Sequence, residues 1–360
     1  MTAELRSGNE VSPCTHPSDP TGFSKRKATR STTPDIGAFG DKKIGIALGA
    51  GSARGIAHIG ILQALRDMGI EPHIVCGCSI GALVGASYVT GQLDEFGEWV
   101  SALGARDVVR YLGIRPFARG GVAEAAELIE HLSASHGNPD ISTLGKPFAA
   151  IATDLYAGRE VWLEDGPIWD AVRASIAIPG MITPVLERGR WLVDGALVNP
   201  VPVSVCRALG ADLVIAVNPS TLMRRSTAQI QLALEEDELP EDNEENTENA
   251  NFLGRIGSAL RGATNPIRRL VTDYQEHWSE RQERPATLEV MQGAITIMQD
   301  RITRSRLAGE PPDVILLPHV SHIGLLEYHR AAEAIAAGRA CVEINATTIC
   351  HALELPSPNA

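Results

Sequence analysis

The chain has 360 residues, of which 44% are hydrophobic and 21% charged, and its formal net charge is −12. This balance is ordinary for a globular protein and allows a sizeable core to be buried. Residues 235–248 hold nine acids and no Lys or Arg, so the rest of the chain is only mildly acidic. No broad basic face is evident, which argues against nucleic acid as a partner.

The six cysteines are scattered without the CxxC spacing of a zinc or redox site, so we expect free, reduced thiols and no metal. The N-terminal residues lack the apolar stretch of a signal peptide. No apolar run approaches the ~18 residues of a membrane span. These features predict a cytoplasmic protein.

Residues 1–41 are rich in Ser, Thr, Pro and Gly and predict a disordered tail. The tail contains a basic cluster, Lys25–Arg30, which is either a solvated linker segment or a site of weak attraction to anionic lipid headgroups. Ordered structure is expected from about residue 42 onward.

The first ordered segment, 43–51, predicts a short buried strand that ends in glycines. Residues 54–68 have apolar side chains every three positions and predict a helix, which Gly69 ends. A second strand at 73–78 leads directly into a second, mostly buried helix at 79–91. This order predicts two parallel strands joined by a right-handed crossover.

Strand and helix patterns continue to alternate along the rest of the chain. Further strands are predicted at 148–154, 160–164, 190–195, 211–218 and 313–319. Further helices are predicted at 121–135, 168–176, 202–209, 289–309 and 329–342. The alternation predicts one layered α/β domain, built from residues 42–220 and completed by 286–345, with 346–360 as a tail.

Residues 221–285 interrupt the pattern and predict an insertion that contains the disordered acidic run. Within it, Phe252, Leu253, Ile256 and Leu260 share one helical face. This segment is either a helix that packs on the core or a lid helix that lies on a lipid surface.

Ser79 lies in the stretch GCSIGALVGAS, between an apolar strand and an apolar helix. A strand-to-helix turn presents its side chain at the carboxyl edge of the sheet and at a helix N-terminus, where free N–H groups favour negative charge. Gly77 and Gly81 relieve crowding around the turn. A lone GxSxG occurs by chance, but this context indicates a nucleophile rather than an ordinary turn residue.

A glycine-rich loop, LGAGSARG at 48–55, opens the first helix. Attack of a serine on an ester creates an oxyanion, and such a loop supplies the N–H donors that this oxyanion needs. A dinucleotide-binding loop is the alternative. However, Arg54 occupies the position of the third glycine in GxGxxG, and no acid ends the second strand.

Asp194 ends an apolar strand in WLVDGALVNPVP and is followed by Gly195. A carboxylate at a strand end can lie beside Ser79 and accept its proton. The alternative is an aspartate that only caps a turn through the backbone.

Together, the glycine loop, the elbow at 77–81 and the segment 194–196 resemble the patatin-like phospholipases, of the bacterial, cytosolic type. The resemblance covers about residues 43–220 and is expected to continue through 289–342. It implies a three-layer patatin-like fold and a serine acyl hydrolase of lipid esters, either phospholipids or lysophospholipids. It also implies that no cofactor is needed.

The resemblance assigns roles to particular residues. Ser79 is the nucleophile, and Asp194 is its base in a two-residue dyad without histidine. The N–H groups of Gly51 and Ser52 form the oxyanion hole, and Arg54 fixes the loop and adds positive potential. The family usually has glycine where this chain has Ser52, and a positive φ would be less comfortable for a serine.

Other residues are expected to be structural: His58 on the first helix, and Asp154, which supports a turn near the site. The expected partners are a lipid ester and, transiently, a membrane surface. No residue is singled out for substrate binding, and the oligomeric state is not predicted.

Two other functions stay open. An α/β-hydrolase with a Ser-Asp-His triad would recruit His319, His322 or His329, although the glycine loop argues against it. A non-catalytic lipid-sensing module on the same fold is the second, and the presence of both Ser79 and Asp194 weakens it.

Overall fold

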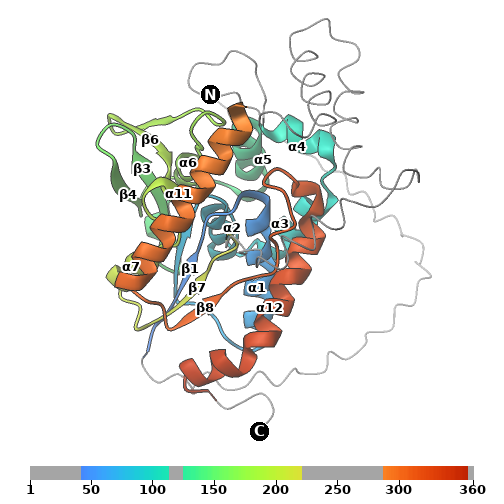
Figure 1. The fold of residues 1–360 in the computed structure, drawn as a ribbon, viewed down its shortest axis with the longest axis vertical. Helices are drawn as coiled ribbons and strands as arrows, with labels where there is room; N and C mark the ends of the chain where they lie inside the picture. Colours follow the sequence, from blue (N-terminus) through green and yellow to red (C-terminus); the bar gives the residue numbers. More distant parts are fainter. Residues whose placement is uncertain (1–41, 113–124, 221–286, 356–360) are drawn as a thin grey trace, which may run out of the picture. The chain divides into compact units, whose positions relative to one another are not determined.

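The structure, a computed structural model, describes residues 42–112, 125–220 and 287–355 (Figure 1). The expected tail at 1–41, the acidic run and the candidate lid helix at 252–260 lie outside these residues. So do the first residues of the helix predicted at 121–135.

The described residues form an eight-stranded sheet with a parallel centre, as predicted. The parallel strands are β3 (Phe148–Asp154), β2 (Ile74–Cys78), β1 (Ile44–Leu48), β7 (Leu213–Val217) and β8 (Val314–Leu316), in that spatial order. Three antiparallel strands complete the sheet. They are β4 (Arg159–Leu163) and β6 (Arg190–Asp194), which pair with β3, and β5 (Val185–Glu187), which pairs with β6.

The register on β3 brings the ends of β2 and β6 together. Ile151 pairs with Cys78 of β2 on one edge and with β4 on the other. Ala152 pairs with Asp194 of β6 and also with β4, so β6 lies on the same edge of β3 as β2. Ser79, which follows Cys78, therefore lies next to Asp194, although the two residues are far apart in the sequence.

Helices surround the sheet and include short 3-10 segments (η). Before β4 they are η2 (Ser52–Ile56), α1 (Ala57–Asp67), α2 (Ile80–Val89), α3 (Leu93–Ala102), α4 (Ala105–Leu112), α5 (Ala126–His136) and η3 (Ile141–Thr143). After β4 they are α6 (Ile168–Ser175), η4 (Gly195–Leu197), α7 (Val203–Ala208), α11 (Thr287–Gly309), η5 (Tyr328–Arg330) and α12 (Ala331–Ala352). None of them, within the part of the chain that the structure describes, combines the length and apolar character needed to cross a membrane.

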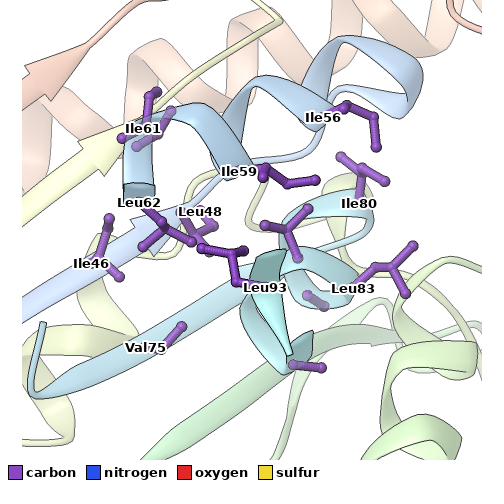
Figure 2. Close-up of a cluster of buried hydrophobic side chains, with 14 of the residues drawn as sticks. Ile46, Leu48, Ile56, Ile59, Ile61, Leu62, Val75, Ile80, Leu83 and Leu93 are labelled. Atoms are coloured by element: carbon purple, nitrogen blue, oxygen red, sulfur yellow. The ribbon is translucent and has the colours of Figure 1, made fainter. Parts of the chain in front are cut away.

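Strand residues alternate between two buried faces, which makes the fold three-layered. On one face, Ile46, Leu48 and Val75 pack against Ile59 and Leu62 of α1 in the main core (Figure 2). This core also contains residues of α2, α3, α5, α6 and α12. On the other face, alternate residues of β1, β2, β3 and β7 pack against α7, with Leu307 of α11 at the margin. The cysteines of the described residues are free and buried.

The structure differs from the sequence-based expectations at its C-terminal helix and in three additional elements. The helix α12 continues through Ala352 because Ile349 is fully buried in the core, so a tail that starts at residue 346 is wrong. The helices α3 and α4 and the strand β5 were not predicted. In α3, Leu93, Phe96 and Val100 are buried at spacings of three and four, so a helical signal was present.

Candidate active site

Ser79 occupies a tight elbow between β2 and α2. Its backbone has φ 56° and ψ −124°, a conformation that costs energy for a residue with a side chain, and the residue is only 5% exposed. A Cβ on Gly77 would collide with the backbone of Gly81 and Ala82, and one on Gly81 with the carbonyl of Leu48. The two glycines therefore permit the turn that presents the serine, as the sequence indicates.

Asp194 lies in direct contact with this serine. The Ser79 hydroxyl donates to Asp194 Oδ2 at 2.6 Å, and the Ala196 N–H donates to the other carboxylate oxygen at 2.8 Å. Asp194 is 3% exposed, and burial raises its pKa to about 6 although both hydrogen bonds favour the charged form. A carboxyl group with this pKa is mostly ionised at pH 7 and becomes protonated only slightly below that pH.

The end of α6 holds both members of this pair. The Ser175 hydroxyl accepts a hydrogen bond from the Ser79 N–H at 2.9 Å and donates to the Ile151 carbonyl at 2.6 Å. Two residues later, the Ala177 carbonyl accepts from the Asp194 N–H at 2.9 Å. Sequence reasoning did not single out Ser175, because its partners are distant in the chain and no motif links them.

The glycine loop lies beside Ser79. The Gly49 N–H donates to Val217, the Ala50 N–H to Pro200 and the Ala53 N–H to Leu325. Ser52 adopts φ 49°, the conformation that a glycine would take more easily.

The N–H groups of Gly51 and Ser52 are the candidate oxyanion donors. Neither finds an acceptor among the described residues. By contrast, the Ser79 N–H is already occupied by Ser175. Two N–H groups that have no acceptor in the described part of the chain and lie beside a buried serine fit what an oxyanion hole requires.

Arg54 and His58 hold the loop from two sides. The Arg54 Nε donates to the Ile323 carbonyl at 2.6 Å, and the residue is not among those that line the two cavities described below. His58 is fully buried, and burial lowers its pKa to about 4, so its neutral ring donates through Nε2 to the Gly49 carbonyl at 2.7 Å. Both contacts support the shape of the loop.

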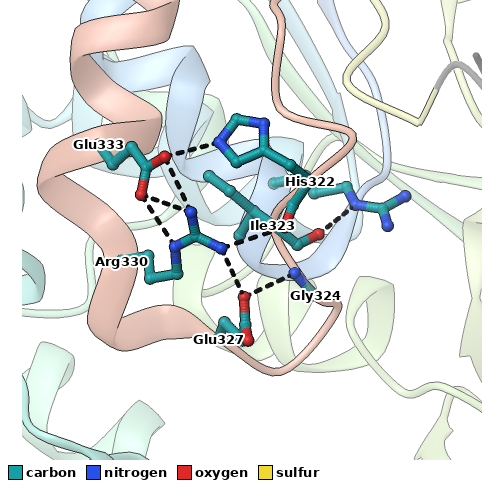
Figure 3. Close-up of polar contacts among 7 residues, drawn as sticks. His322, Ile323, Gly324, Glu327, Arg330 and Glu333 are labelled. Carbon is teal, nitrogen blue, oxygen red and sulfur yellow. Dashed lines mark hydrogen bonds and ion pairs between the residues drawn. The ribbon is translucent and has the colours of Figure 1, made fainter. Parts of the chain in front are cut away.

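The segment 322–333, whose Ile323 carbonyl accepts the hydrogen bond from Arg54, is itself held by ion pairs (Figure 3). Arg330 lies between Glu327 and Glu333, and Glu327 also accepts from the Gly324 N–H. His322 donates to Glu333 at 2.6 Å. Of the three histidines of the triad alternative, His322 is thus engaged on the surface, whereas Ser79 contacts Asp194 directly. Asp154, as expected, caps a turn, where it accepts from the Tyr156 and Ala157 N–H groups.

Two cavities meet at the serine. Ser79 and Ser52 line both of them. The first extends among apolar side chains of α2, α3, α4 and α5. The second is lined by Asp194 and by Thr296 and Gln299 of α11, together with apolar residues. An acyl carbon at Ser79 would therefore have room on both sides.

Comparison with known proteins identifies relatives of this chain. A family model described as patatin-like phospholipase matches residues 46–207. An uncharacterised NTE family protein of Mycobacterium tuberculosis is 34% identical over 337 residues, which cover 83% of this chain and 89% of that protein. A protein with a corresponding description from Mycobacterium bovis gives the same figures.

More distant matches cover less. The Lysophospholipase NTE1 of Coccidioides immitis is 30% identical over 185 residues, which are 49% of this chain and 11% of that protein. Among solved structures, VipD of Legionella pneumophila aligns with a TM-score of 0.34 and 16% identity over 54% of this chain and 53% of VipD.

Proposed function

Because the chain belongs to the patatin-like phospholipase family, we propose that it is a serine acyl hydrolase that cleaves the carboxylic esters of lysophospholipids or phospholipids. The fungal relatives named as lysophospholipases support the first of these substrates. The observation that carries the proposal is the 2.6 Å hydrogen bond from the Ser79 hydroxyl to the buried Asp194 carboxylate, at the point where two cavities meet.

Acylation begins when Ser79 Oγ forms a bond to the ester carbonyl carbon and its proton moves to Asp194. The carbonyl oxygen becomes an oxyanion and accepts hydrogen bonds from the N–H groups of Gly51 and Ser52. The bond from carbon to the alcohol oxygen then breaks, and the departing alcohol takes the proton from Asp194. An acyl ester of Ser79 remains.

Deacylation repeats the same steps with water. Asp194 accepts a proton from water as the water oxygen attacks the acyl carbon, and the oxyanion again lies at Gly51 and Ser52. The bond to Ser79 Oγ breaks, the serine regains its proton, and the fatty acid leaves. The direct contact between Ser79 and Asp194 leaves no need for a histidine between them, which supports a dyad over a triad.

The proposal includes transient contact with a membrane surface, because the substrate is a lipid. A cytoplasmic location is part of the same proposal.

The test is a panel of chromogenic acyl esters and defined lysophospholipids and phospholipids, combined with labelling by a fluorophosphonate. Wild type should hydrolyse members of the panel and be labelled at Ser79, and Ser79→Ala should do neither. Asp194→Asn keeps the shape of the side chain but removes its basicity, so turnover should fall by ~10²–10⁴-fold.

Alanine variants of the triad candidates His319, His322 and His329 are the matched controls and should stay within a few-fold of wild type. If one of them folds normally and is as inactive as Ser79→Ala, the dyad is wrong. If Ser79→Ala keeps full activity, the proposed function itself is wrong.

A further inference from the structure

We propose that the first cavity, which is lined by apolar side chains, is the site for the acyl chain of the ester, and that Trp99 limits the length of the acyl chain that fits there. The proposal rests on the proposed function and adds to it a substrate property, the preferred number of carbons.

The first cavity suits a hydrocarbon chain. None of its lining residues carries a charge, and most are aliphatic or aromatic. They include Leu83 of α2, Val100 of α3 and Val108 of α4. Burial of each methylene in such surroundings stabilises a complex enough to raise affinity about 4-fold.

The position of the base decides which cavity holds which part of the ester. Asp194 lines the second cavity and not the first. The departing alcohol must reach Asp194 to recover a proton, so the alcohol lies in the second cavity, which also offers the polar side chains of Thr296 and Gln299. The acyl chain is thereby directed into the first.

Trp99 is held by other aromatic rings in the wall of the first cavity. Its ring stacks on His131 of α5 at 5.0 Å between centroids and meets the edge of Tyr111 of α4 at 5.1 Å. Phe96 lies 5.7 Å away on the same helix, α3. Trp99, Tyr111 and Phe96 all line the cavity. Because contacts from three helices hold the indole, a long chain cannot easily displace it.

The experiment measures kcat/KM for p-nitrophenyl esters of saturated acids from four to eighteen carbons. Wild type should gain with each added methylene and then lose activity once the chain reaches the wall. Trp99→Ala should move the optimum to longer chains, with the ratio of long-chain to short-chain kcat/KM rising at least 10-fold. Leu103→Phe, at a half-buried lining position, should move it to shorter chains.

Trp162→Ala is the matched control, because this tryptophan is 39% exposed on β4 and lines neither cavity. Its chain-length profile should match that of wild type. Profiles of Trp99→Ala and Leu103→Phe that are parallel to wild type would overturn the proposal, and if Trp99→Ala does not fold, the Leu103→Phe profile decides alone. If the profiles are parallel, the proposed function still stands, since wild type hydrolyses esters that Ser79→Ala does not.

A second readout does not depend on hydrolysis. Calorimetry can measure the binding of saturated fatty acids of increasing length to the Ser79→Ala protein. We expect a limit in chain length, and Trp99→Ala in the same background should extend this limit. No binding would overturn the first cavity as the acyl site, and an unchanged limit would overturn Trp99 as the residue that sets the chain length.

Discussion

At the scale of the residue, the proposed mechanism makes the pH response of the site depend on the carboxyl group of Asp194. Burial is the largest influence on it and raises its pKa to about 6, above the ordinary value of 3.8. In the proposed mechanism, Asp194 accepts the proton of Ser79 only when its carboxyl group is ionised.

We therefore expect kcat/KM for a short soluble ester to fall as the pH decreases through about 6. The acid limb reports the free enzyme and should follow a single ionisation. A pH–rate profile between pH 4.5 and 8 checks this, with circular dichroism at each pH to verify folding. A rate that is constant down to pH 5 would contradict a buried Asp194 as the base.

Ser175 provides the second prediction at this scale. Ser175→Ala removes the acceptor of the Ser79 N–H and the donor to the buried Ile151 carbonyl. Loss of such contacts typically costs about 1–3 kcal/mol. The elbow should also lose its fixed geometry, so we expect kcat to fall by on the order of 10-fold or more, with little change in KM.

Ser87→Ala is the control for this variant. Ser87 is also a fully buried serine whose hydroxyl bonds to a backbone carbonyl, that of Leu83, but it does not contact the elbow. It should lose stability without a specific loss of kcat. Equal kcat in the two variants would show that Ser175 has only a general structural role.

At the scale of the element, the packing of α1 against α12 depends on two glycines. A Cβ on Gly60 of α1 would collide with the Ile335 carbonyl of α12, and a Cβ on Gly338 of α12 with the Ala57 carbonyl of α1. At each glycine, the backbone of the other helix therefore lies in the space that a side chain would occupy. The atoms that would be struck belong to helix backbones, which cannot move aside as a flexible side chain can.

Gly338→Ala should therefore destabilise the protein by about 1–3 kcal/mol or more, the usual range for overpacking. Gly293→Ala in α11 is the matched control, because the same substitution there meets nothing within 4 Å. Alanine favours a helix by up to ~1 kcal/mol over glycine, so the control should be neutral or slightly stabilising. Urea denaturation of both variants distinguishes the two outcomes, and equal stability would contradict close packing of the helices.

At the scale of the whole molecule, residues 287–355 share the sheet and the main core with residues 42–220. The family match ends at residue 207, but β8 pairs with β7, and α12 contributes buried residues such as Val342 and Ile349 to the main core. The same segment supplies the Ile323 carbonyl that holds Arg54.

A chain that ends at residue 220 should consequently fail to form a cooperative fold, because it would expose the β7 edge and the core surface that α12 covers. Thermal unfolding followed by near-UV circular dichroism is the measurement. Deletion of only 235–249, which the sequence predicts to be disordered, is the comparison and should change the melting temperature little. A cooperative transition in the truncated chain would show that 42–220 folds alone.

Ser79, Asp194 and the glycine loop could be singled out from the sequence as candidate site residues, because each is marked by a local pattern. A buried strand that ends in glycines and a polar residue places that residue at the edge of a sheet, whatever the rest of the chain does. The central strands and the flanking helices follow from hydrophobic periodicity in the same way.

The tertiary structure was needed for everything that depends on contacts between distant segments. The pairing of Ala152 with Asp194 places the carboxylate beside Ser79, and Ser175 reaches the elbow only because α6 packs over β3. The wall around Trp99 joins three helices, two of which the sequence did not predict. Local pattern determines which residues are buried, whereas strand register and helix packing determine which buried residues contact one another. The chemistry proposed for this site depends on those contacts.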